Sequence, residues 1–376
     1  MSITRRDLCA RSAWIATAVV VLLYAPMALE FTARLFTDDA PRLWDHTFAG
    51  VVGERQALGP GSIHEVQHEN YGQHRTVLLA HTTVGALAIS LSVFQLSRRS
   101  RTKIAVHRQV GRVQCSLAVV SMIGAITYLL LVGPDGTFDG PAFYLQLWAL
   151  AIGTLVATLL GWLAIRRGHL SSHRILMTYA FALLCTAPFL RVLYLLFGLA
   201  WPDSTQLVTN LAGASVLAVW APMAAAFASR RVPVARRREQ LTPLPGPALE
   251  RGALVVSTIG AAALTVGYAA AFDGLDRITI TAIVANALGI ALTALNLREA
   301  DDRTAREEWR IHHTAMLAGL PLTALLWLTY TVPFTTEQAF YGAILTGPAV
   351  ALSAAVGLVA WRRRIPARRP AAAVTA

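Results

Sequence analysis

The amino-acid sequence predicts an all-α fold, a polytopic transmembrane helix bundle of about ten spans with both termini in the cytoplasm. Hydrophobic residues make up 55% of the 376-residue chain and charged residues only 14%, whereas soluble globular domains carry about 25% charged residues. The mean hydropathy is +0.51. These values exclude a disordered chain, a coiled coil and an ordinary soluble enzyme.

Ten mostly apolar runs reach the roughly 20 residues that a helix needs to cross a bilayer. Gly-Pro, Asp-Gly and Trp-Pro-Asp sequences separate several of these runs, as turns do. Prolines inside the runs are compatible with spanning helices, because neighbouring helices can satisfy the freed carbonyl groups. The predicted spans are approximately 14–33, 76–97, 112–133, 142–165, 175–199, 206–229, 252–272, 278–297, 311–333 and 339–361.

The basic residues predict the orientation of these spans, because cytoplasmic loops of membrane proteins are enriched in Lys and Arg. With the N-terminus and every second loop in the cytoplasm, 27 of the 33 Lys and Arg residues lie on that side, and Arg191 falls inside a span. The net charge of +12 therefore indicates orientation and contact with anionic lipid at the cytoplasmic face. Nucleic acid is not an expected partner. We expect a bacterial-type inner membrane location, and the oligomeric state stays open.

A basic, proline-rich segment divides the spans into two predicted modules. This segment, residues 230–251, contains Arg236-Arg237-Arg238 and three closely spaced prolines, and it is the predicted cytoplasmic linker. Arg5-Arg6 ahead of the first span resembles a twin-arginine export signal, but the further spans favour an uncleaved basic flank. The other predicted parts are a six-span module over 1–229 with an external histidine-rich segment over 34–75, a four-span module over 252–361 and a basic cytoplasmic tail over 362–376.

Arg191 is the clearest polar side chain inside a predicted span, and an ionisable residue in lipid marks a function by default. It lies about 24 Å along a helix that starts near Ile175, roughly 6 Å from the outer edge of the ~30 Å hydrocarbon core. Alternatively, Arg191 reaches external headgroups or pairs with Asp203. Glu30, His81 and Gln146 reach a similar outer level, and Glu30 could neutralise Arg191. The predicted pocket residues are Glu30, Gln95, Gln146 and Arg191.

Histidine next to arginine opens the third, fifth and ninth spans at the cytoplasmic boundary, for example His107-Arg108 and His173-Arg174. Interfacial anchoring on anionic lipid is one interpretation. Ligation of heme b by facing imidazoles, with arginines pairing the propionates, and quinone binding are the others. His173 and Arg191 are spaced by about five helical turns and so are expected on one face. The candidate cofactor residues are His81, His107, His173, Arg108, Arg112 and Arg174.

The external segment contains the sequence His64-Glu65-Val66-Gln67-His68, followed by His74. The first five residues match H-E-x-x-H, in which two imidazoles bind zinc and the glutamate acts as general base. A loop of about 40 residues is too small for a zincin protease, so the metal candidates His64, His68 and His74 would bind an external Zn or Cu. The alternative is a polar loop or lid over the outer pocket.

Several of these motifs follow one another in a fixed order between His81 and Phe197. They are His81 with Gly85 and Gln95, His107-Arg108-x-x-Gly111-Arg112, the Gly133–Gly140 turn, Arg166-Arg167-Gly168-His169, His173-Arg174 and Arg191. Residues from about 76 to 200 resemble a family of bacterial integral membrane proteins, domain of unknown function 2306. The chain departs from the family pattern at Ile175, where an aromatic residue is expected. The resemblance implies a membrane protein and no particular reaction.

Three functions fit these observations. The first is a membrane redox or quinone-linked protein, with heme b bound through bundle histidines. The second is a transporter or a lipid- or anion-binding protein, in which Arg191 holds a carboxylate or phosphate through charge-assisted hydrogen bonds. The third is a membrane scaffold subunit without chemistry of its own, in which these side chains affect abundance only. The sequence does not decide between enzyme and non-enzyme.

Overall fold

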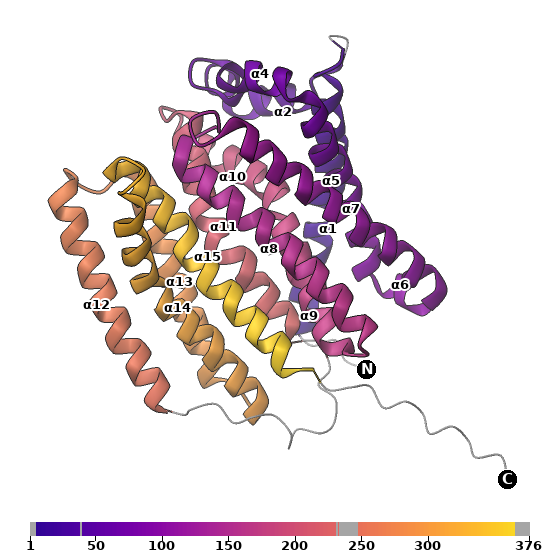
Figure 1. Ribbon diagram of the computed structural model, residues 1–376, viewed down its shortest axis with the longest axis vertical. Helices are drawn as coiled ribbons and strands as arrows, with labels where there is room; N and C mark the ends of the chain where they lie inside the picture. The colour runs from indigo at the N-terminus through magenta and orange to yellow at the C-terminus, as the bar shows by residue number, and fades with distance from the viewer. Residues whose placement is uncertain (1–4, 38–39, 231, 233–246, 365–376) are drawn as a thin grey trace.

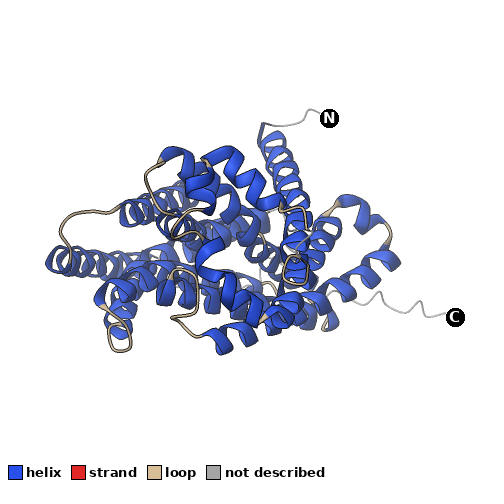
Figure 2. Cartoon of the chain, turned by 90° about the horizontal axis from the view of Figure 1, so that it is seen from above, coloured by secondary structure: helices blue, strands red, loops and turns tan. Residues whose placement is uncertain are grey.

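The computed structural model describes residues 5–37, 40–230, 232 and 247–364. Every regular element in these ranges is an α-helix (Figure 2), so the predicted all-α class is confirmed. The helices are α1 (Arg5–Ala33), α2 (Leu43–Val52), α3 (Glu54–Leu58), α4 (Ile63–Gln73), α5 (Arg75–Leu96), α6 (Arg98–Thr102), α7 (Ile104–Val132), α8 (Gly140–Arg166), α9 (Leu170–Leu184), α10 (Thr186–Ala200), α11 (Gln206–Ser229), α12 (Pro247–Ala271), α13 (Arg277–Arg298), α14 (Arg303–Tyr330) and α15 (Thr336–Arg362).

Ten helical stretches in the described ranges are long and apolar enough to cross a membrane, which confirms the predicted number of spans. They run side by side in Figure 1, with α12 at one edge of the bundle. Within the apolar window of each span, 67% of the residues of α11 and α15 are buried, against 11% for α1 and α12. Helices α11 and α15 therefore form the centre of the bundle, while α1 and α12 turn most of their apolar surface towards lipid.

The fifth span is broken into two helices, α9 and α10, which meet at Cys185. Pro188 lies in the first turn of α10 and has no N–H to donate, so the helical hydrogen bonding cannot run through this point. The Thr186 hydroxyl donates to the carbonyl of Leu183 at 2.6 Å and satisfies one of the freed groups. The predicted common face of His173 and Arg191 stays a prediction, because the two residues lie on the two halves of this broken span.

Three short helices, α2, α3 and α4, cover one end of the bundle, which we call the upper face (Figure 1). They occupy most of the predicted external segment 34–75. Gln206, at the start of α11, fastens them to the bundle, since its Oε1 accepts the Ile63 N–H at 2.7 Å. The first turns of α1 and α9 and the last turn of α15 lie at the opposite end, the lower face (Figure 1).

The two predicted modules share one hydrophobic core. A single buried cluster contains Ala157 and Ile175 from the first six spans and Ile311 and Val356 from the last four. Arg363, at the end of α15, adds a polar link between the modules, because its guanidinium donates to the carbonyl of Ser229 on α11 at 3.5 Å while both oxygens of Glu308 on α14 accept from it. The same guanidinium donates to the Val232 carbonyl at 2.9 Å. Most of the predicted linker lies outside the described residues, but its two flanking modules are packed as one body.

Candidate functional site

Arg191 lies on α10, nine residues before the end of that helix at Ala200, which is about 14 Å along the axis. Its guanidinium carbon is 5.7 Å from the centroid of the Tyr194 ring. The phenol groups of Tyr24 and Tyr71 are also near enough to interact electrostatically with it. Within the described chain, no residue forms an ion pair or a hydrogen bond with Arg191. It is thus a half-buried cation surrounded by tyrosines.

Tyr71 links this arginine to a second aromatic group. It comes from α4 on the upper face. The centroid of its ring lies 5.8 Å from that of Phe31 on α1 and 6.1 Å from that of Tyr128 on α7. The Tyr128 hydroxyl is buried and has no hydrogen-bond partner among the described residues. We call the set of Tyr24, Tyr71, Tyr128, Arg191 and Tyr194 the tyrosine-arginine site.

A chain of hydrogen bonds joins Tyr194 to the turn that precedes α8. The Tyr194 hydroxyl donates to the Asn210 side chain, whose amide group donates to Asp139 Oδ2. Asp139 has a φ of 62°, a left-handed conformation that aspartate tolerates better than most residues. Its second oxygen, Oδ1, is buried and, among the described residues, without a partner. Unpaired polar atoms in such a place are costly unless a ligand or water satisfies them.

Burial sets the protonation of two groups at this end of the molecule. It raises the pKa of the Asp139 carboxyl well above its ordinary value, and the hydrogen bond from Asn210 offsets only part of that shift. Burial likewise raises the pKa of Tyr71 to about 12, although the positive charge of Arg191 acts in the opposite direction. Tyr71 is therefore a neutral hydrogen-bond donor at physiological pH, and burial shifts Asp139 towards its protonated form.

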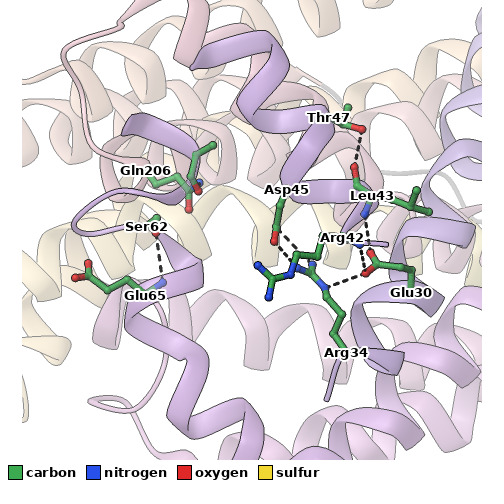
Figure 3. A network of polar contacts seen from close by, with 10 residues as sticks. Glu30, Arg34, Arg42, Leu43, Asp45, Thr47, Ser62, Glu65 and Gln206 are labelled. Carbon is green, nitrogen blue, oxygen red and sulfur yellow. Dashed lines mark hydrogen bonds and ion pairs between the residues drawn. The ribbon is translucent and has the colours of Figure 1, made fainter. Parts of the chain in front are cut away.

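Glu30 does not neutralise Arg191, contrary to one sequence-based expectation. Its carboxylate forms an ion pair with Arg34, one turn along α1, at 3.0 Å and accepts the backbone N–H groups of Arg42 and Leu43 at 2.9 and 3.1 Å. Arg34 also pairs with Asp45 (Figure 3). Glu30 thus serves as an acceptor at the start of α2 and fixes that helix to α1. No ion pair joins Arg191 to Asp203 in the described chain either.

The other predicted pocket residues hold pairs of helices together. The His81 imidazole lies 3.0 Å, through Nδ1, from the Ser121 carbonyl oxygen on α7. The Gln146 side chain donates to the Ala214 carbonyl at 2.9 Å, and Gln95 donates to the His107 carbonyl at 3.0 Å. Each of these side chains therefore has a structural partner. Their membership of a common pocket with Arg191 stays a prediction.

His107 and His173 lie near each other at the lower face, where their imidazoles interact electrostatically. His173 Nδ1 lies 2.9 Å from the Gly161 carbonyl oxygen, so Nδ1 carries the proton and Nε2 keeps its lone pair. His107 Nδ1 is 2.9 Å from the Ser100 hydroxyl. The charge of Arg174 acts on both imidazoles, whereas Arg108 and Arg112 are exposed.

The H-E-x-x-H sequence forms the first turns of α4, and Glu65 has a local role there. The Ser62 hydroxyl accepts the Glu65 N–H at 3.3 Å, while the Glu65 carboxylate accepts the Gly61 N–H at 2.6 Å. These reciprocal bonds stabilise the start of α4 in the manner of a capping box. The His64 and His68 side chains lie outside the described residues. In the described part of the chain, no group of three or more His, Cys, Asp or Glu side chains could hold a metal ion.

Part of the chain that forms this site matches a known protein family. Residues 78–223 match the family model described as "Predicted membrane protein (DUF2306)". This region, which we call the DUF2306 region, is therefore similar to that family. The DUF2306 region extends beyond the predicted 76–200 through most of α11, and it contains Tyr128, Asp139, Arg191 and Asn210. No curated protein and no solved structure matches the chain.

The tyrosines around Arg191 were not predicted as site residues, although each lies in or beside an apolar span. Tyr24 and Tyr71 come from outside the DUF2306 region, on α1 and α4. A polar side chain within an apolar run is the sequence feature that could have indicated these residues. Asn210, near the start of α11, shows this feature most clearly. The DUF2306 region thus supplies the cation, and neighbouring helices complete its surroundings.

Proposed function

We propose that this integral membrane protein binds a small anion, a carboxylate or a phosphate, at Arg191, as a transporter or a lipid- or anion-binding protein does. The observation that carries the proposal is a half-buried guanidinium in a spanning helix with no acidic partner in the described chain. An ionisable residue at this depth is costly and needs compensation. An anionic ligand supplies the missing charge through short, charge-assisted hydrogen bonds.

The neighbours of Arg191 suit the rest of such a ligand. Burial raises the pKa of Tyr71 to about 12, so its hydroxyl is neutral at physiological pH and can donate a hydrogen bond to an anion. The Tyr128 hydroxyl lies in the same group of rings and has no partner in the described chain. Acceptance of an anion there would satisfy donors that are otherwise buried and unpaired.

The position of the site supports entry from the upper face. Tyr71 belongs to α4, which covers the bundle end, so movement of α4 would expose Arg191. The break at Cys185 lies below the arginine, and transporters commonly place substrate beside such interrupted helices. In this proposal, α4 is the lid over the site.

Binding by the purified full-length protein tests this function. Its melting temperature is measured in detergent with inorganic phosphate, citrate and dihexanoyl phosphatidic acid, and hits are quantified by calorimetry. Arg191→Ala should abolish the stabilisation by every hit. Arg75→Ala is the matched control, because Arg75 is another upper-face arginine whose recorded contact is aromatic, 5.3 Å from the Phe36 ring. Unchanged affinity in Arg191→Ala, or no binding to wild type, would refute the proposal and favour a scaffold subunit.

A second candidate function, redox or quinone chemistry, is favoured by the proximity of His107 and His173. The Nε2 lone pair of His173 is available, and the Gly161 carbonyl fixes its tautomer through Nδ1, as is usual for a metal-bound histidine. Reduced-minus-oxidised spectra of the membrane-purified protein test heme b directly. An alpha band that disappears in His173→Ala and persists in His313→Ala would support heme b, whereas a featureless spectrum would exclude it.

A further inference from the structure

We propose that a cavity at the lower face, lined by Arg167, His169 and Arg364, binds the phosphate of an anionic phospholipid. The cavity has a volume of about 60 Å³ and lies between the α8–α9 turn and the end of α15. One water needs about 10–15 Å³ on this measure, so the cavity accommodates a phosphate group and excludes a large cofactor. It is separate from the tyrosine-arginine site at the upper face.

Charge is the first reason for this assignment. Arg167 and Arg364 both line the cavity, and no acidic residue of the described chain does. Two arginines beside the cavity, Arg362 and Arg363, are instead paired with Glu307, at 2.6 Å, and Glu308. Arg167 and Arg364 form no ion pair within the described residues. Two uncompensated guanidinium groups in one cavity complement a phosphate.

An unpaired donor is the second reason. His169 is the N-cap residue of α9, and its Nδ1 is buried without a hydrogen-bond partner among the described residues. Ser172, on the same side of α9, is already engaged, because its hydroxyl donates to the Ala360 carbonyl at 2.6 Å. That bond ties α9 to α15 and fixes the walls of the cavity. A phosphate oxygen would satisfy His169 Nδ1.

The surroundings identify a lipid as the source of the phosphate. Arg167 directly follows the last residue of spanning helix α8, so the cavity lies at the depth of lipid headgroups. Leu160 and Leu163 line it and are each 40% exposed, which gives an acyl chain a surface along α8. Trp361 lines it as well and is exposed, as is typical of the membrane interface.

Gly357 provides the path for that acyl chain. It lies on α15 and lines the cavity, and a Cβ added there would meet no atom within 4 Å. A larger side chain at this position would occupy the cavity, and its Cβ would meet no atom of a neighbouring helix. A substitution at Gly357 therefore tests the contacts of the lipid's acyl chain independently of the contacts that the two arginines make with the headgroup.

Native mass spectrometry of the full-length protein in detergent tests the proposal, with dioleoyl phosphatidylglycerol and dioleoyl phosphatidylcholine as probes. Wild type should bind phosphatidylglycerol more tightly. The double variant Arg167→Ala/Arg364→Ala should lose about thirtyfold in affinity, from the usual contribution of two basic residues at an anionic surface. Arg166→Ala removes the same charge from the same turn outside the cavity and should bind like wild type.

Two further measurements distinguish a lipid from free phosphate and from misfolding. Gly357→Leu should keep the wild-type melting temperature and weaken phosphatidylglycerol binding at least about tenfold. Inorganic phosphate at millimolar concentration should not displace the lipid. The proposal is overturned if Gly357→Leu binds lipid like wild type, if inorganic phosphate displaces the lipid completely, or if Arg166→Ala loses as much affinity as the double variant.

Discussion

Replacement of Glu308 by glutamine should destabilise the protein by about 3–5 kcal/mol, the usual cost of breaking a buried ion pair at one partner. Glu308 and Arg363 are only 5% and 3% exposed, so water cannot compensate the charge that is left. Arg363 keeps its hydrogen bond to the Val232 carbonyl, but no other carboxylate is recorded on it in the described chain. This loss of free energy raises the equilibrium constant for unfolding by about 150- to 5000-fold.

The assay is equilibrium unfolding in mixed micelles, followed by tryptophan fluorescence. The double variant Glu308→Leu/Arg363→Met should recover part of the loss, because apolar residues replace the pair. About 1–3 kcal/mol should stay lost, since the Val232 carbonyl no longer has its donor. Arg303→Ala is the control, because Arg303 pairs with Glu307 but its side chain is 77% exposed, and exposed pairs contribute about 0–1 kcal/mol. A loss in Glu308→Gln no larger than in Arg303→Ala would refute the reasoning.

Three further predictions concern single residues in the same unfolding assay. Asp139→Asn should flatten the pH dependence of the unfolding free energy above about pH 4. The raised pKa of Asp139 makes the carboxyl's contribution complete below its unfolded pKa of about 3.9, and the contribution is lost as pH rises towards the folded pKa. Asp276→Ala should cost about 1–2 kcal/mol, because the Asp276 carboxylate accepts two backbone N–H groups at the start of α13. Gly347→Ala should cost about 1–3 kcal/mol, since its Cβ would lie 2.9 Å from the Cα of Thr323; Gly357→Ala, with open space around its Cβ, should not.

Each of these predictions has a distinct contradicting result. A pH profile of Asp139→Asn parallel to that of wild type would mean that this carboxyl ionises equally in both states. An unchanged unfolding free energy in Asp276→Ala would mean that water replaces the cap without loss. Equal effects at Gly347 and Gly357 would show that close approach of α14 and α15 is not what limits the side chain at Gly347.

The spans could be predicted from the sequence because the length and polarity of an apolar run suffice to identify a membrane helix. The break in the fifth span was also within reach, since Pro188 cannot donate a helical hydrogen bond. It was interpreted instead as one of the prolines that a spanning helix tolerates. The segment 34–75 was expected as a loop, yet it forms α2, α3 and α4, whose apolar faces become evident only against the bundle end.

The candidate site could be predicted only in part. Arg191 was identified by its depth, a property of one helix, whereas Tyr24 and Tyr71 reach it from α1 and α4 through tertiary packing. The depth of Glu30 suggested a distant partner, but Arg34 lies one helical turn away, where side chains meet readily. An opposite charge one turn away is a more favourable partner than one on another helix, because only the remote pair requires two helices to be ordered first.

The central place of α15 has a consequence for biosynthesis. This helix packs against α8, α9, α11 and α14, yet it is the last of the described helices to leave the ribosome. Until it does, Glu308 has no recorded cationic partner and the core faces of four earlier spans have no neighbour to bury them. Chains usually fold from the N-terminus during synthesis, but here membrane insertion of the earlier spans must precede their final packing. A nascent chain stalled before α15 would expose an unpaired carboxylate and an open core, which are features that membrane quality control can recognise.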